Sequence, residues 1–247
     1  MKPALIPKTK FSDLQLLGGL KGLSWLSTTQ LRELDDSMTS RNVKHKGLIF
    51  EEKGVLSLDT HILLTGTAEL CHMDGARSRV VAILSPGVIF RMPLMARGID
   101  HTFRWTALND CRVSQLTTNS FIRISLGIGV LPADFIRVAD IENPRWGSLM
   151  GRYPSFINLS LSGRVAVALL ELSLEFGVQN TRGILIRITL TQRQLADLVG
   201  ASRAKVGLVL RDLELKKIIV REGHQLAVVV RRLEAMVKSG GREEELM

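Results

Sequence analysis

The sequence predicts an α+β protein with a strand-rich N-terminal part, a helical middle and a C-terminal part of short helices and strands. Between Val43 and Thr118, short apolar or alternating runs are separated by turn signals, as expected for antiparallel strands. Helical spacing of apolar residues then returns and dominates Gly163–Phe176. The chain has 247 residues, of which 45% are hydrophobic, so one large or two ordinary folded domains are expected.

The stretch Ile186–Leu213 has the signals of two short helices joined by a tight turn. Thr191 is followed at the third helical position by Gln194, which is typical of a helix start. Gly200 stands where a chain leaving a helix often takes a positive φ, and Ser202 is placed to cap a second helix. The expected buried faces have helical spacing and comprise Leu195, Leu198 and Val199, then Val206, Val209, Leu210 and Leu213.

This pattern predicts a helix-turn-helix whose second helix exposes the basic residues Arg203, Lys205 and Arg211. A strand is expected before the unit, over Ile184–Thr189. Two more, Ile218–Val220 and Leu226–Val230, flank a hairpin-like turn at 221–224. The outline is that of a winged helix-turn-helix, and DNA binding is expected. An ordinary helical hairpin with a solvated polar face is the alternative interpretation.

The net charge of +9 favours a polyanionic partner, and most of it lies in one part of the chain. Residues 182–238 contain 12 Lys or Arg and 5 Asp or Glu, a net charge of +7. Five of these cations are expected to meet phosphates, with a solvated charged surface as the alternative for any one: Lys216, Lys217, Arg221, Arg231 and Arg232.

A cytoplasmic protein with no membrane partner is expected. No apolar run approaches the roughly 18–20 uncharged residues that span a bilayer. The N-terminal stretch also lacks the apolar core of a secretory signal.

The residues that commonly bind metals are few and scattered. Cys71 and Cys111 are too few for a four-cysteine zinc or iron–sulfur site, and we expect both to be reduced and buried. A catalytic metal in a barrel needs clustered ligands, and the histidines show no paired spacing: His45, His61, His72, His101 and His224. The sequence therefore predicts neither a metal site nor an enzyme.

Short amphipathic helices are expected before the strands. Apolar residues recur from Phe11 to Leu34, with breaks at Gly18-Gly19 and Gly22, and Ser27 precedes a second helix start. The expected strands are Val43–Lys46, Ile49–Phe50, Thr60–Leu64, Ala68–Met73, Arg79–Leu84 and Phe103–Leu116. Such regular spacing favours a small sandwich or barrel of about eight strands.

Helices are expected again over Asn119–Ile124, Pro132–Ile141 and Gly163–Phe176. The last is capped at 160–162 and ended by Gly177. Pro144 and Pro154 interrupt the segment before it, which argues against one long straight helix. The predicted domains are a strand-rich domain with flanking helices over residues 1–131, a connecting segment over 132–158 and a winged helix-turn-helix over 159–240.

Three stretches of the strand-rich part resemble the cyclic-nucleotide-binding β-roll: Lys46–Phe50, Ile62–Leu70 and Leu84–Phe90. With Leu161–Leu172 and, most specifically, Leu190–Arg203, nearly the whole chain resembles the CRP/FNR family of bacterial transcription regulators. The resemblance implies a jelly-roll-like sensory domain, a connecting dimerisation helix and a homodimer on palindromic double-stranded DNA. It also implies contact with RNA polymerase. Packing around Phe135, Val138 and Ile141 is one way to hold the subunits together.

The resemblance also assigns roles within the helix-turn-helix. Thr191 and Gln192 would approach the phosphate backbone, while Ser202 and Arg203 open the recognition helix. Arg203 is the candidate for a bidentate contact to guanine, because its planar fork matches O6 and N7. Ala204 and Leu208 depart from the family, which often has an acidic residue and a second Arg there, so a different half-site is expected. Ser202 and Lys205 are expected to help Arg203 in reading bases, while Lys205 and Arg211 shift the load towards phosphate contacts. The charge distribution adds Lys216 and Lys217 as phosphate contacts.

The predicted sensory domain departs from the cyclic-nucleotide binders. Those proteins carry a Gly-Glu-Leu turn and then Arg-(Ser/Thr)-Ala, whereas residues 90–98 lack the Glu. His101 or Thr102 stands near the Arg position, and three cations are out of register: Arg91, Arg97 and Arg104. Because a buried cyclic phosphate needs a paired cation and several donors, we expect neither cyclic AMP nor cyclic GMP, and no cofactor.

Two alternatives for the sensory domain remain open. The domain is either a scaffold in an effector-independent regulator or holds haem or a metal ion. Cys71-His72 offers a candidate axial haem ligand, although adjacent strand residues point to opposite faces. The effector is unknown from the sequence.

Overall fold

The computed structural model describes residues 12–52, 59–75, 77–90, 102–131, 134–135, 156 and 158–240. The chain forms two compact units, one of residues 1–68, 86–100 and 106–144, the other of 69–85, 101–105 and 145–247. Phe11 itself, the segment 91–101 and nearly all of the connecting segment 132–158 lie outside the described residues, whereas the helix expected just after Phe11 is described and is capped by Ser12. The predicted boundaries at either end of that connecting segment therefore stay predictions.

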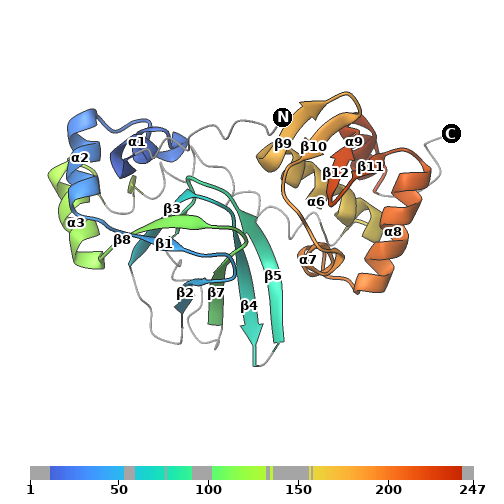
Figure 1. Ribbon diagram of the computed structural model, residues 1–247, viewed down its shortest axis with the longest axis horizontal. Coiled ribbons are helices and arrows are strands. Elements are labelled where there is room, and N and C mark those ends of the chain that lie inside the picture. The colour runs from blue at the N-terminus through green and yellow to red at the C-terminus, as the bar shows by residue number, and fades with distance from the viewer. Residues whose placement is uncertain are drawn as a thin grey trace, which may run out of the picture. The chain divides into compact units, whose positions relative to one another are not determined.

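The α+β fold class is confirmed, with a strand-rich N-terminal part and a C-terminal winged helix-turn-helix (Figure 1). The N-terminal strands form two four-stranded sheets, ordered β1-β8-β3-β6 and β2-β7-β4-β5. In the first sheet β8 pairs antiparallel with both β1 and β3, placing Thr39 opposite Gln115 and Thr60 opposite Leu116. The strands are β1 (Thr39–Val43), β2 (Leu48–Glu52), β3 (Thr60–Thr65), β4 (Ala68–Asp74), β5 (Arg77–Leu84), β6 (Ile89–Phe90), β7 (Thr102–Ala107) and β8 (Cys111–Leu116).

Two predicted strands were wrong in their bounds. The strand expected at Val43–Lys46 is instead β1, which ends at Val43, because the chain turns at once and Lys46 takes a φ of 63°. The single strand expected over Phe103–Leu116 is two strands, β7 and β8. Asn109 stabilises the connection between them, since its Oδ1 accepts a hydrogen bond from the Thr67 backbone N–H at 2.8 Å.

Three helices and one 3₁₀ turn pack in a common core with the first sheet. They are α1 (Asp13–Gly18), η1 (Lys21–Leu23), α2 (Thr28–Asp36) and α3 (Thr118–Gly127). The predicted start at Ser27 is confirmed by a capping box with Gln30. One face of β3 packs with these helices in a common core that includes Leu17, Leu23, Leu34, Ile62, Leu64, Leu116 and Phe121.

Phe135 belongs to this core rather than to a subunit contact. It is 2% exposed, and its ring meets Trp25 edge-on at a centroid distance of 5.2 Å and Phe121 at 5.3 Å. The suggestion that Phe135 packs against a partner subunit is therefore corrected, because its own chain already buries it. Val138 and Ile141 lie outside the described residues.

The C-terminal part is built around α6, which is capped by Ser160 and begins two residues before the predicted start. Its sheet has the order β11-β12-β10-β9, with Ile184 opposite Val228 of β12 and Gln179 of β9. The elements are α6 (Leu161–Phe176), β9 (Gly177–Asn180), β10 (Gly183–Ile186), α7 (Gln192–Leu198), α8 (Arg203–Leu215), β11 (Ile219–Glu222), β12 (Gln225–Val228) and α9 (Val230–Lys238).

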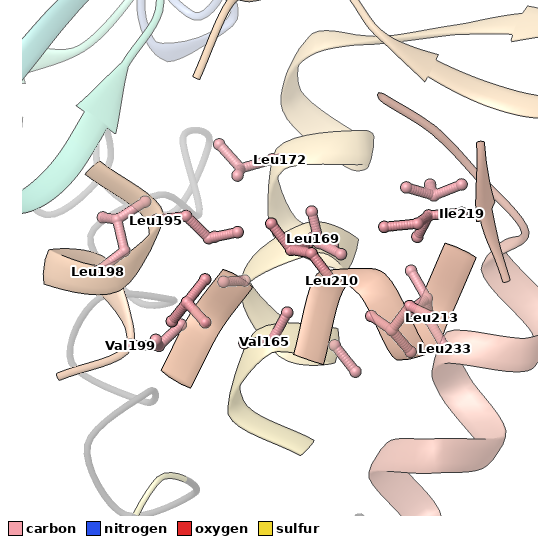
Figure 2. Packing of buried hydrophobic residues seen from close by; sticks show 14 of the residues in the cluster. Val165, Leu169, Leu172, Leu195, Leu198, Val199, Leu210, Leu213, Ile219 and Leu233 are labelled. Atoms are coloured by element: carbon pink, nitrogen blue, oxygen red, sulfur yellow. The ribbon is translucent and has the colours of Figure 1, made fainter. Parts of the chain in front are cut away.

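One apolar cluster joins all the helices of this part (Figure 2). Figure 2 shows Val165 and Leu169 of α6 near the centre beside Leu210 of α8. The α7 side chains lie on one side of them, and Leu213 of α8 and Leu233 of α9 lie on the other. The predicted buried faces of the two short helices are confirmed, except that Val209 is only partly buried. Burying each large side chain stabilises the fold by about 1.5–3 kcal/mol. The cluster therefore holds α7 and α8 in a defined position against α6.

Two elements of this part were not predicted, and two of the predicted strands were too long. Strand β9 follows α6 directly, and α9 begins at Val230, where a strand was expected to end. The strand expected over Ile184–Thr189 stops at Ile186, and the one expected over Leu226–Val230 stops at Val228.

Candidate nucleic-acid interface

The first helix of the motif, α7, begins with a complete capping box. Thr191 Oγ1 accepts a hydrogen bond from the Gln194 backbone N–H at 3.1 Å. In return, Gln194 Oε1 accepts from the Thr191 backbone N–H at 2.9 Å. Each bond satisfies a donor that the first turn of a helix leaves free, so the helix start is fixed at the predicted residue.

The turn between the helices depends on Gly200. Its φ of 63° is a conformation that side chains disfavour, and the Ala201 backbone N–H donates to the Ala196 carbonyl at 2.9 Å. Val199, just before it, is fully buried. The positive φ of Gly200 and the burial of Val199 in the core therefore both hold the turn in place, as predicted.

The second helix, α8, is capped by Ser202, whose Oγ accepts from the Lys205 backbone N–H at 3.4 Å. Its inner face buries Val206, Leu210 and Leu213. Gly207 faces α7, since a Cβ there would lie 3.6 Å from Gln192 Oε1. The outward face of α8 consists of exposed residues, namely Arg203, Ala204, Lys205, Leu208 and Arg211.

A surface hollow of about 590 Å³ lies at the N-terminal ends of the two helices. Three of the predicted DNA-binding residues, Thr191, Gln192 and Arg203, line it together. Arg193 lines it too and is exposed, although it was not assigned a role from the sequence. Its place in the first turn of α7, next to the assigned Gln192, was the signal that could have identified it.

The predicted residues Lys216 and Lys217 lie beyond the other end of α8, about 20 Å along a helix of 13 residues. Lys216 Nζ is 2.9 Å from Asp212 Oδ2, and its carbonyl accepts a hydrogen bond from Arg232 Nη1 at 2.9 Å. Arg221 pairs with Glu214. Two of the cations expected to meet phosphates are thus partly neutralised within the chain, while Arg203, Lys205 and Arg211 are exposed on α8.

Both cysteines are free and buried, as predicted, and burial raises the pKa of each thiol. The described part of the chain holds no cluster of three or more His, Cys, Asp or Glu side chains suited to a metal ion. Within that same part, no helix is long and apolar enough to cross a membrane.

Comparisons with known proteins agree with this geometry. Residues 163–238 match the Crp-like helix-turn-helix domain. The chain is 21% identical over 196 residues to the anaerobic regulatory protein of Bacillus subtilis (strain 168), covering 78% of this chain and 81% of that one.

Two solved structures show the same fold over most of the chain. A CooA variant from Carboxydothermus hydrogenoformans has a TM-score of 0.64 and 16% identity, covering 86% of this chain and 91% of that one. A CRP/FNR-family transcriptional regulator from Thermus thermophilus has a TM-score of 0.63 and 19% identity, covering 82% of this chain and all of the other.

The fold and the capped helix-turn-helix define a class of protein, a transcription regulator with a C-terminal winged DNA-binding domain. Within that class, residues 163–238 form a Crp-like helix-turn-helix domain, and most of the chain has the same fold as the solved CRP/FNR-family regulator.

Proposed function

We propose that this chain is a sequence-specific transcription regulator that binds a palindromic duplex as a homodimer in the cytoplasm and is not an enzyme. The observation that carries the proposal is the outward face of α8, where Arg203, Lys205 and Arg211 are exposed on a helix capped at Ser202. The N-terminal residues of such a helix contact base edges in the major groove. The two-fold symmetry of a dimer matches the symmetry of a palindrome.

In this proposal each predicted residue has a defined role. Arg203 donates two hydrogen bonds to a guanine and supplies most of the base discrimination. Thr191 and Gln192, at the start of α7, contact the phosphate backbone beside it. Ser202 opens the recognition helix and, with Lys205, assists Arg203 in reading the bases. The salt-dependent part of the affinity comes from Lys205, Arg211, Lys216 and Lys217. RNA polymerase is the expected protein partner once the duplex is occupied.

The strand-rich domain is proposed to respond to a signal other than a cyclic nucleotide, because the sequence lacks the Glu and in-register Arg that hold one. The alternative is an effector-independent regulator in which this domain is a scaffold. Equal duplex affinity with and without a cell extract supports the alternative. An extract component that changes the affinity supports a sensory role.

Binding by the full-length chain to duplexes recovered by selection from a random pool tests the function. The proposal expects recovery of two inverted half-sites about one helical turn apart, and affinity that falls steeply with salt. Arg203→Ala should lose about 1–3 kcal/mol of discrimination at one guanine of each half-site.

Arg123→Ala is the matched control, since it removes the same exposed charge from α3 in the strand-rich part. Discrimination that survives Arg203→Ala unchanged contradicts the assigned role of Arg203. Recovery of no preferred sequence contradicts the function itself.

A further inference from the structure

The outward face of α8 carries exposed apolar side chains among its basic residues. Leu208 exposes 70% of its surface, and Ala204, four residues earlier, is also exposed. Residues four apart on a helix lie one above the other on the same face. Ala204 and Leu208 therefore form a short apolar strip on the N-terminal two turns of α8, the part of such a helix that reaches base edges.

The charge around this strip decides what can cover it. All the exposed residues of α8 are basic or apolar, and none is acidic: Arg203, Ala204, Lys205, Leu208, Arg211 and Leu215. An apolar protein surface pressed onto the strip would remove water from three cations without pairing them, which is costly. DNA supplies phosphates for the cations and, within the groove, an apolar group of its own.

We infer that Ala204 and Leu208 read thymine through its 5-methyl group in the major groove. The inference deepens the proposed function and rests on it. Among the four bases, only thymine presents a methyl group there, and apolar side chains are its usual partners. An acidic side chain at 204 would instead accept a hydrogen bond from cytosine, so Ala204 removes one specificity and permits another.

The helix geometry also sets the spacing of the thymines. Four residues of α-helix rise about 6 Å, and successive base pairs are about 3.4 Å apart. The methyl groups contacted by Ala204 and Leu208 are therefore about two base pairs apart. Because Arg203 directly precedes Ala204, the half-site is a guanine followed closely by A·T pairs.

Replacing thymine with deoxyuridine tests the inference, because it removes the methyl group and keeps every hydrogen-bonding atom. The probe is the selected duplex, with each thymine of the half-site replaced in turn in both copies. At one or two positions the wild-type chain should bind about fourfold more weakly per methyl, which is about 0.8 kcal/mol at 1.4 kcal/mol per tenfold. The positions should be about two base pairs apart.

Two variants assign the effect to Leu208. Leu208→Asn should bind the thymine and deoxyuridine duplexes equally at one position, because its polar end gains nothing from the methyl. Leu215→Asn is the matched control, since Leu215 is 77% exposed but lies in the last turn of α8, away from the base-reading end. It should keep the fourfold difference.

Three outcomes overturn the inference while leaving DNA binding intact. They are a selected half-site without thymine, no loss of affinity at any deoxyuridine, and a loss that Leu208→Asn keeps in full. In each of these cases the selected palindrome and its salt dependence still stand. Failure to recover any preferred duplex overturns the proposed function and this inference together.

Discussion

Gly177 packs directly against the last turn of α6, so that a methyl group built on it would lie 1.9 Å from the carbonyl oxygen of Ser173. The same methyl would lie 2.3 Å from Cγ2 of Ile184 in β10. With φ −81° and ψ 143°, Gly177 has a backbone conformation open to any residue, so space alone demands glycine there. The missing side chain lets α6 pass straight into β9.

Gly177→Ala should therefore lower the free energy of unfolding by about 3 kcal/mol, because the methyl collides with a backbone carbonyl that cannot rotate away. Gly207→Ala is the matched control, since its methyl would meet nothing closer than Gln192 Oε1 at 3.6 Å. Helix propensity should make that control neutral or up to about 1 kcal/mol stabilising. Urea unfolding measures both, and equal effects would contradict the packing argument.

Thr191→Ala should cost about 1 kcal/mol of stability, because it removes the hydroxyl that accepts from the Gln194 backbone N–H. Thr191→Ser keeps that hydroxyl and should stay close to wild type. Both changes can be followed by urea unfolding in the absence of DNA, where any phosphate contact plays no part. If the Ser and Ala variants lose the same stability, the capping bond does not stabilise α7.

The winged domain was largely predictable because its signals are local. Caps at Thr191 and Ser202, together with the glycine at 200, fix each helix from within a few residues. Helix α9 had a signal of similar kind, because Val230, Leu233 and Met236–Val237 recur at helical spacing. That signal was missed because Val230 also ends the apolar run Leu226–Val230, which is typical of a single strand.

The strands were harder to place because their bounds depend on distant partners. β1, with the sequence TSRNV, lacks an apolar alternation because it is the edge strand of its sheet and most of its residues face solvent. Its place is set by pairing with β8, some 70 residues later, as in Val43 opposite Cys111. The roles proposed for individual residues in DNA binding stay predictions, because they depend on a second molecule rather than on neighbouring residues of the chain.

His61 in β3 should make the fold sensitive to acid. It is 5% exposed, its ring centroid is 4.6 Å from that of Phe50, and burial, aided by Arg41 and opposed by Asp59, lowers its pKa to about 4. The unfolded chain binds a proton near pH 6.5 and the folded chain does not, so stability is full above pH 6.5 and is lost as the pH falls towards 4.

Between pH 7.5 and pH 5 this one group should cost about 2 kcal/mol. His61→Gln has no such proton, so its loss of stability over the same interval should be smaller by that amount. Urea unfolding at the two pH values gives the comparison, in which other titrating groups cancel. Parallel losses in both proteins would show that His61 is not the responsible group.

The contribution of each cation to the salt dependence of DNA binding should be larger for Lys205 and Arg211 within α8 than for Lys216 beyond its end. Lys205→Ala and Arg211→Ala should each weaken binding to every duplex by a similar factor and reduce the slope of log K against log salt by about 1. Lys216→Ala should reduce the slope less, because Lys216 already pairs with Asp212 at 2.9 Å. Titrations at several salt concentrations, with Arg123→Ala as the unchanged reference, measure the slopes. A Lys216 effect equal to that of Lys205 would mean that the Asp212 pair opens completely on DNA.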